Sequence, residues 1–268
     1  MGVYDITGNK IGDLDNSFAD NMQLDYRFDE ATNANYTVLR IFKVKLDGTK
    51  QYPFVYVPNG TGAATQSTLQ MNIEKKFNVA INGGVFTMSS DSDNGKPRGV
   101  IVQDGNLIQQ GTSSSRIFPL VIDSNGDLGY AQPDASGTEL IANGAVSVLS
   151  GWAPIIINYD DASLVISGAY HDDTNAQRQI LGQFGNGDYA IITCEGRNYD
   201  HSDGWTIDEA ITVCKEIGLR FAYNLDGGGS TETVIGKKQI NTIYEGTYGR
   251  IVPTYVVFNG TDAFGVPS

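Results

Sequence analysis

Eight consecutive residues combine a carboxylate, three glycines and two hydroxyls directly after an apolar stretch. In chain order they are Asn224, Leu225, Asp226, Gly227, Gly228, Gly229, Ser230 and Thr231. We call residues 224–231 the glycine loop. Adjacent glycines leave backbone N–H groups open to an anion, because no side chain covers them. A carboxylate and two hydroxyls around such a run do not contribute to a packed core, so the segment indicates an active-site loop at a strand end.

Two nucleotide-binding alternatives fail on the residues of this loop. A P-loop carries a lysine and then Ser or Thr after its last glycine, whereas Ser230 follows Gly229 directly. A dinucleotide-binding fingerprint has spaced glycines that open a helix, whereas these glycines are contiguous and residues 231–235 have a strand pattern. Taken alone, an ordinary glycine-rich turn stays open as the structural alternative.

Three further sites carry groups that could bind or react. Asn82 and Gly83 follow a short apolar run, and an asparagine at a strand end can bind through its carbonyl and its amide. Arg178 leads into a second apolar run, and Glu195 and Arg197 end a third one. Taken singly, the three sites are consistent with a turn, a surface charge and a surface ion pair. Their occurrence together with the glycine loop favours a functional site.

A strand–helix–strand unit is predicted in the last third of the chain. Residues 189–195 are rich in branched side chains and predict a strand, and residues 221–225 predict another. Between them, residues 207–217 have the periodicity of an amphipathic helix. Thr206 and Glu209 form a capping-box pattern at its start.

This unit is expected to bring two carboxylates together. Strands joined by a helical crossover are favoured to run parallel. Glu195 and Asp226 would then lie at the same edge of the sheet, where α/β sheets place their ligands. We therefore treat the two carboxylates as one constellation.

The rest of the chain predicts a strand-rich body. Residues 1–35 form a polar, acidic lead-in, and residues 37–46 and 52–57 predict an antiparallel hairpin. The other predicted elements are a helix at 66–77 and short strands at 78–81, 99–102, 107–108, 118–122, 155–158 and 164–167.

No repeat or linker divides the chain. We expect an α+β fold, a single strand-rich domain with a mixed sheet, a few helices and the C-terminal crossover that carries the glycine loop. Residues 1–60 would supply its lead-in and hairpin, and residues 61–268 its catalytic body.

The composition is that of a folded, acidic protein. Of the 268 residues, 40% are hydrophobic, with 14 Tyr and 11 Phe, and the formal net charge is −13. Because nucleic acids and anionic membrane surfaces attract basic clusters, which this chain lacks, neither is an expected partner. No run is long enough for a transmembrane helix, so no membrane insertion is expected. An anionic substrate would need a local positive pocket.

Cysteine and histidine usage predicts no disulfide and no zinc site. Cys194 and Cys214 are expected to be buried free thiols, and His171 and His201 are the only histidines. Residues 1–20 lack the basic start and apolar core of a signal peptide. The location stays open between the cytoplasm, a virion and secretion of a form whose signal has been removed.

The chain resembles the phosphodiester glycosidase family. The resemblance covers residues 78–258, and the glycine loop is its most specific element. The matching blocks, in the order of the family, are 82–86, 98–105, 178–182, 195–197, 224–231 and 250–258. Two departures occur: Glu195 stands where the family more often has aspartate, and residues 232–234 lack the methionine often found there. Neither removes a needed functional group.

The resemblance implies hydrolysis of the bond between the anomeric carbon of a sugar and a phosphate, with N-acetylglucosamine 1-phosphodiesters as the first candidate substrates. Bacterial wall polymers and nucleotide sugars share this linkage. Since the second pKa of a departing phosphomonoester is near 6, stabilising its charge matters more than protonating it, and arginines and N–H groups suit that task. Asp226 and Glu195 would be catalytic, as the nucleophile or base and its electrostatic partner. The expected substrate- and phosphate-binding residues are Arg178, Arg197, Asn82, Gly83, Asn224, Gly227, Gly228, Gly229, Ser230 and Thr231.

Two alternatives are left open. Asp226, Glu195 and Asn224 offer oxygen ligands suited to Ca²⁺ or Mg²⁺, so either cation is possible although the sequence requires no cofactor. A non-catalytic glycan-binding domain of a phage tail or surface-attachment assembly would recognise a phosphorylated glycan without cleaving it. Retention of both acids and both arginines favours an enzyme, and the intact glycine loop disfavours a purely structural tail component.

Overall fold

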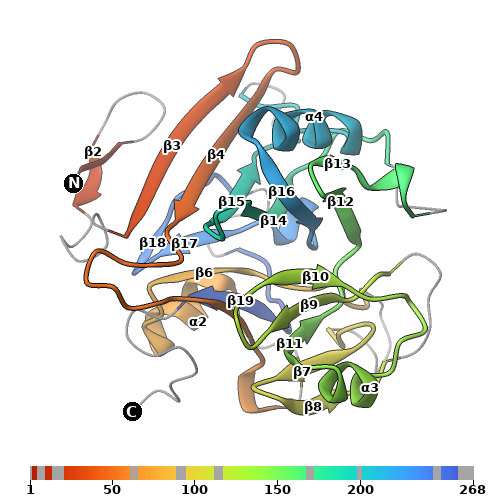
Figure 1. The fold of residues 1–268 in the computed structure, drawn as a ribbon. Helices are drawn as coiled ribbons and strands as arrows, with labels where there is room; N and C mark the ends of the chain where they lie inside the picture. Colours follow the sequence, from red (N-terminus) through yellow and green to blue (C-terminus); the bar gives the residue numbers. More distant parts are fainter. Residues whose placement is uncertain are drawn as a thin grey trace.

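Three antiparallel β-sheets share one hydrophobic core in the computed structural model (Figure 1). The structure describes residues 2–4, 10–13, 21–60, 62, 66–88, 95–111, 117–166, 172–197, 201–243 and 249–258. A separate N-terminal hairpin pairs β1 (Gly2–Tyr4) with β2 (Lys10–Asp13). Of the helices in the described ranges, none has both the length and the apolar character that crossing a membrane requires.

The largest sheet has seven strands and carries the strand–helix–strand unit. In spatial order they are β13 (Asp160–Asp161), β12 (Ala153–Ile157), β16 (Leu219–Asn224), β14 (Arg178–Phe184), β15 (Tyr189–Cys194), β4 (Ala34–Ile41) and β3 (Met22–Asp29). As predicted, β15 and β16 run in the same direction, because β14 lies between them and is antiparallel to both. Their carboxyl ends therefore lie at one edge of the sheet. The expectation of a mixed sheet is wrong, since every pair of neighbouring strands in the described ranges is antiparallel.

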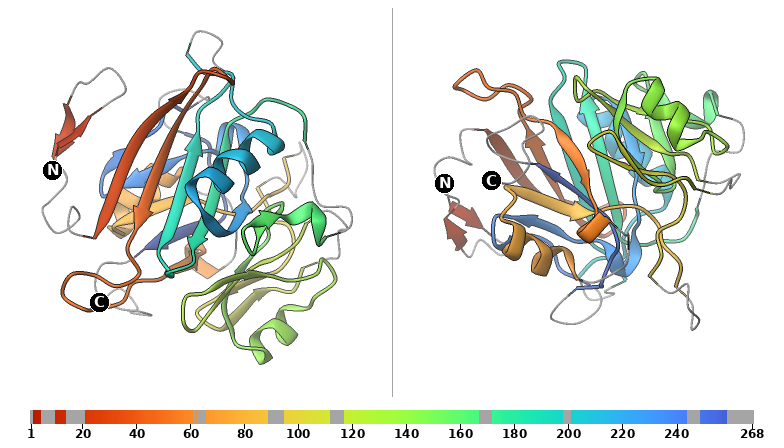
Figure 2. Two further views of the ribbon diagram at one scale, coloured as in Figure 1. Left: turned by 45° about the horizontal axis from the view of Figure 1, so that its top comes forward. Right: turned by 90° about the horizontal axis from the view of Figure 1, so that it is seen from below.

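Two five-stranded sheets complete the body. The second sheet contains β18 (Lys238–Gln239), β17 (Thr233–Ile235), β6 (Val79–Asn82), β19 (Tyr255–Phe258) and β5 (Pro53–Tyr56). The third contains β10 (Leu128–Tyr130), β9 (Leu120–Asp123), β11 (Ala145–Leu149), β7 (Ile101–Gln103) and β8 (Asn106–Gln109), and it projects to one side of the other two (Figure 2). Buried side chains from all three sheets form the main core, among them Leu39, Val55, Ile81, Ile101, Leu120, Leu181 and Ile191.

Helices cover the outer faces of the sheets. The helix α4 (Ile207–Ile217) packs Ile207, Ala210 and Cys214 on the outer face of the seven-stranded sheet. The helix α2 (Thr68–Lys75) packs against β6 and β17, and α3 (Gly137–Ala142) against the third sheet. Short 3₁₀ turns are η1 (Pro58–Gly60), η2 (Ala162–Leu164) and η3 (Gly228–Ser230). The fold is therefore α+β, as predicted, and the two cysteines are buried free thiols, also as predicted.

Two local predictions are wrong. The predicted hairpin at 37–57 does not form, because β4 pairs with β3 and β15, whereas β5 pairs with β19 in another sheet. β4 is buried along most of its length and lies between β15 and β3, and the more exposed β3 is the edge strand of the sheet. The predicted strand at 164–167 is instead the end of η2, with Leu164 and Val165 exposed. Ser167 and His171 lie outside the described residues.

Candidate active site

The glycine loop follows β16, at the sheet edge where β15 also ends (Figure 1). Its backbone is fixed by two neighbours. The Leu225 N–H donates to the Gln179 carbonyl at 2.9 Å, and the Gly228 N–H donates to the Gln177 carbonyl at 2.9 Å. On the other side, the Asp226 N–H donates to the Gly83 carbonyl at 3.1 Å. The loop thus bridges the seven-stranded sheet and the second sheet.

Asn82 and Gly83 hold this bridge in place. The Asn82 side chain is fully buried; its Nδ2 donates to the Asp226 carbonyl at 2.7 Å, and its Oδ1 accepts from the Glu232 N–H at 3.1 Å. A Cβ on Gly83 would lie 2.6 Å from Thr254 Oγ1 and 2.7 Å from the Thr254 carbonyl carbon, so only glycine fits there. Both residues were predicted to bind substrate, and their contacts indicate that they position the loop.

Asp226 is half-buried at the start of the loop. Burial raises its pKa to about 6, while the Ser230 hydroxyl, the charge of Arg250 and the Gly227 N–H act in the opposite direction. Arg250 itself lies against the loop, with Nη1 3.4 Å from Ser230 Oγ. The carboxyl therefore stands near the midpoint between its two protonation states at mildly acidic pH.

Arg197 lies on the exposed side of the same loop. Its backbone has a φ of +56°, and its guanidinium lies beside Gly228, whose φ is +58°. A Cβ on Gly228 would be 3.4 Å from Arg197 Nη1. Together, Arg197 and Arg250 give this edge of an acidic protein the local positive charge that an anionic substrate needs.

Glu195 is held on a different side of the loop. Its Oε1 accepts from the Thr242 N–H at 2.6 Å, and burial raises its pKa, against the hydrogen bonds with Thr242 and the charge of His201. Asn241 links this segment to the loop, because its Nδ2 donates to the carbonyls of Thr231 and Thr242 at 3.1 and 3.2 Å. Glu195 and Asp226 thus occupy the same sheet edge, as expected, each with its own set of partners.

Arg178 has contacts of another kind. It is 4% exposed, and its Nε donates to the Trp205 carbonyl at 2.8 Å. Its terminal nitrogens bond to the Asp172 carboxylate at 3.2 and 3.3 Å and to the Thr174 carbonyl at 2.6 Å. The prediction that Arg178 holds a phosphate stays a prediction, and these contacts indicate that it orders residues 172–178 beside the loop.

Comparison with known proteins places this geometry in a family. Residues 75–259 match the family described as phosphodiester glycosidase. The chain belongs to that family. The match confirms the resemblance inferred from the motifs and includes the candidate residues around the glycine loop.

Three individual proteins similar to this chain are distant relatives in sequence. The SPbeta prophage-derived uncharacterized protein YomE of Bacillus subtilis (strain 168) is 26% identical over 196 residues, which is 72% of this chain and 29% of that protein. The chain thus spans less than a third of that relative. The catalytic domain of zebrafish N-acetylglucosamine-1-phosphodiester alpha-N-acetylglucosaminidase, auto-inhibited by its pro-peptide, has a TM-score of 0.66 at 16% identity, over 89% of this chain and 82% of that one. A hypothetical protein from Synechocystis has a TM-score of 0.60 at 14% identity, over 89% and 62%. These two structures share the fold.

Several buried polar atoms without a hydrogen-bond partner lie in or next to the glycine loop. They include both amide atoms of Asn224, Oε1 of Gln177, Oγ1 of Thr231 and Oε1 of Glu232. Such atoms are few in native proteins and call for an explanation, of which a bound ligand or water is one. By contrast, the N–H of Gly228 is bonded to the Gln177 carbonyl, and the N–H of Gly227 interacts with the Asp226 carboxyl, so the N–H of Gly229 is the remaining candidate in the run for an anion contact.

Two residues of this site escaped prediction from the sequence. In the sequence, Arg250 belongs only to the closing block of the family resemblance, and Glu232 belongs only to the segment that lacks the methionine. Neither has a local signal, because each gains its place through contacts with segments distant in the sequence. The glycine loop itself supplied the signal for Asp226 and Ser230.

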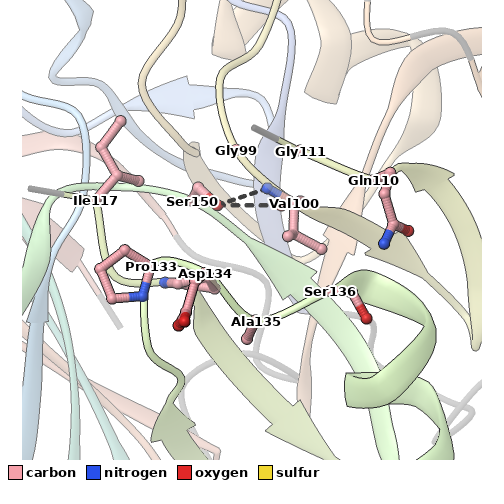
Figure 3. A pocket seen from close by; sticks show the side chains of 11 residues that line it. Gly99, Val100, Gln110, Gly111, Ile117, Pro133, Asp134, Ala135, Ser136 and Ser150 are labelled. Carbon is pink, nitrogen blue, oxygen red and sulfur yellow. Dashed lines mark hydrogen bonds between the residues drawn. The ribbon is translucent and has the colours of Figure 1, made fainter. Parts of the chain in front are cut away.

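No metal is assigned to the site. Within the described ranges, no group of three or more His, Cys, Asp and Glu side chains could hold a metal ion. A cavity of about 90 Å³ lies elsewhere, on the third sheet, where Ser150 bonds to the backbone of Val100 (Figure 3). Its lining also includes Gly99, Gln110, Asp134 and Ser136, and it contains none of the candidate catalytic residues.

Proposed function

We propose that this protein hydrolyses the bond between the anomeric carbon of a sugar and the phosphate of a sugar 1-phosphodiester. One observation carries the proposal: the glycine loop groups a half-buried carboxyl, Asp226, with two arginines. Arg250 lies beside Ser230, and Arg197 lies beside Gly228. Membership of the phosphodiester glycosidase family supports the same reaction class.

The chemistry of the leaving group fits these residues. A departing phosphomonoester needs charge stabilisation more than it needs a proton, because its second pKa is near 6. Guanidinium groups provide charge-assisted, planar hydrogen bonds to phosphate oxygens, and we assign this task to Arg197 and Arg250. The N–H group of Gly229 would add to it.

The two carboxylates would act at the anomeric carbon. Asp226 acts as the nucleophile or base in its ionised form, which the charge of Arg250 favours. Glu195 is the second carboxylate and stabilises positive charge that develops on the sugar. Asn82, Gly83 and Arg178 hold the loop and its neighbours in position.

The substrate class is a phosphorylated sugar. Because the zebrafish relative is an N-acetylglucosamine-1-phosphodiester alpha-N-acetylglucosaminidase, N-acetylglucosamine 1-phosphodiesters are the first class to test. With a net charge of −13, the protein repels anions at long range, so selection of the phosphate must come from the two arginines at the loop.

The test is release of reducing sugar from a panel of sugar 1-phosphodiesters that includes N-acetylglucosamine linked to a phosphosugar and a nucleotide sugar. Asp226→Asn should lose at least ~10³-fold in kcat because the ionised carboxylate is removed while the shape of the side chain is kept. Asp104→Asn is the matched control, since Asp104 is an exposed carboxylate in the turn between β7 and β8 of the third sheet and its loss should leave turnover unchanged.

The outcomes separate the two candidate functions. Turnover by the wild type that Asp226→Asn abolishes supports the proposal. Folded wild-type protein that releases no sugar from any member of the panel, with or without added Ca²⁺ and Mg²⁺, overturns it. Calorimetric binding of the same compounds without turnover would then favour a glycan-binding domain, a role that the prophage-derived relative makes worth testing.

A further inference from the structure

Glu232 is a buried carboxyl directly after the glycine loop. It is 1% exposed, and its Oε2 accepts a hydrogen bond from the Thr68 N–H at 2.8 Å, at the first residue of α2. The donor of that hydrogen bond is a backbone amide and not a cation. The other carboxyl oxygen of Glu232, Oε1, has no hydrogen-bond partner. Burying a carboxyl in this way is unfavourable, so the position calls for a reason beyond packing.

The carboxyl of Glu232 lies flat against Gly249. A Cβ on Gly249 would be 2.8 Å from Glu232 Oε2 and 3.0 Å from Cδ, so a side chain at this position would displace the carboxyl. Gly249 also has a φ of +69°, a conformation that favours glycine. The carboxyl therefore forms the surface on which this backbone rests, immediately before Arg250.

The backbone of Glu232 is connected to the backbone of Asp226 through the side chain of Asn82. Its N–H donates to Asn82 Oδ1 at 3.1 Å, and Asn82 Nδ2 donates to the Asp226 carbonyl at 2.7 Å. One residue thus joins three parts of the molecule: the start of α2, the backbone that carries Asp226, and the segment that carries Arg250.

We propose that Glu232 is a positioning residue, whose buried carboxyl supports Gly249 and thereby holds Arg250 against Ser230 and Asp226. The proposal rests on the proposed function only for the role of Arg250 in binding the phosphate. A purely structural alternative is that Glu232 caps α2 and has no effect on Arg250. The two differ in whether the Arg250 guanidinium responds when Glu232 or Gly249 is changed.

The experiment follows the Nε–Hε signals of the arginine side chains in ¹H–¹⁵N NMR spectra, with Arg250 assigned through Arg250→Lys. Glu232→Ala removes the supporting surface, and Gly249→Ala places a methyl group where the carboxyl lies. Both variants should shift or broaden the Arg250 signal. The Arg178 signal should stay in place, since Arg178 Nε is bonded to the Trp205 carbonyl away from Glu232.

Two further variants separate positioning from helix capping. Glu232→Gln keeps a flat group and an acceptor for the Thr68 N–H, so it should preserve the Arg250 signal. Ser67→Ala removes the N-cap of the same helix, where Ser67 Oγ accepts from the Gln70 N–H. It should lower Tm and leave the Arg250 signal unchanged.

The spectra need no turnover, so they test the positioning role even if the proposed reaction fails. An Arg250 signal that is unchanged in both Glu232→Ala and Gly249→Ala overturns the proposal, and if Glu232→Ala does not fold, Gly249→Ala alone decides. On a substrate that the wild type cleaves, Glu232→Ala should lower kcat/KM at least tenfold, and Glu232→Gln should restore most of it.

Discussion

At the glycine loop, the carboxyl of Asp226 experiences two opposed influences. Burial favours its neutral form, whereas the Ser230 hydroxyl and the charge of Arg250 favour its ionised form. Displacements at a sugar carbon need a carboxylate that is ionised but not strongly solvated. A half-buried acid beside a guanidinium has this character, and an exposed surface aspartate does not.

Two arginines predicted to act alike should respond differently to mutation. Arg178→Ala removes the cation paired with the Asp172 carboxylate and the hydrogen bonds to the Trp205 and Thr174 carbonyls, so we expect a loss of about 3–5 kcal/mol in the free energy of unfolding, as for a broken buried ion pair. Arg197→Ala removes an exposed side chain and should leave stability nearly unchanged. It should lower kcat/KM by about 10- to 100-fold, the effect of one charge-assisted hydrogen bond to the phosphate.

Urea unfolding and steady-state kinetics on both variants provide the measurements, and Lys215→Ala, an exposed cation on α4, is the control. Equal effects of the two variants on stability would contradict the assignment of Arg178 to a supporting role.

The sequence identified Asp226, Glu195 and Arg197 because strand ends and glycine runs are local signals. It could not tell whether Arg178 is supporting or ligating, because that depends on which face of β14 the side chain occupies. This face is decided by pairing with β15 and β16. Glu232 and Arg250 gain their places only when the segments around residues 68 and 249 pack on the loop.

At the scale of the elements, features that depend on neighbouring residues were predicted from the sequence, whereas strand pairings between distant residues were not. The helix α4 was predicted with its true bounds, because its capping box, its apolar face and the left-handed Gly218 are all encoded nearby. The pairing of β4 with β15 and of β5 with β19 joins residues far apart in the sequence, and the hairpin predicted from proximity was therefore wrong.

The close contact between Gly83 and Thr254, directly before β19, can be tested by mutation. In Gly83→Ala, the new Cβ would lie 2.6 Å from Thr254 Oγ1 and 2.7 Å from the Thr254 carbonyl carbon. The backbone must shift to relieve this contact, at a cost of about 1–3 kcal/mol in the free energy of unfolding. Because the Gly83 carbonyl accepts from the Asp226 N–H, kcat should fall as well.

Thermal unfolding and reducing-sugar release measure the two effects. The matched control is Gly129→Ala in β10, where a Cβ would meet nothing within 4 Å. Full activity in Gly83→Ala would show that Asp226 does not depend on this contact.

At the scale of the whole molecule, the site differs from the rest of the protein in two ways: it carries positive charge in an acidic chain, and burial disfavours the ionisation of its carboxyls. The chain carries a net charge of −13, yet its glycine loop is bordered by Arg197 and Arg250. Burial raises the pKa of Asp226 to about 6, and it raises the pKa of Glu232 to about 7. Two carboxyls whose ionisation is disfavoured, one in the glycine loop and one directly after it, must influence the stability of the entire fold.

The direction of that influence follows from proton linkage. Because the pKa of Asp226 is higher in the folded than in the unfolded protein, the folded state binds more protons between about pH 4 and pH 6, and stability falls as the pH rises through this range. A shift of about two units corresponds to at most about 3 kcal/mol. Asp226→Asn cannot ionise, so its free energy of unfolding should exceed that of the wild type by about 1–3 kcal/mol at pH 8 and by little at pH 4. Urea unfolding of both proteins at pH 4, 6 and 8 measures the difference, with Asp104→Asn as the control. A difference that stays constant across these pH values would mean that Asp226 ionises in the fold as readily as it does in water.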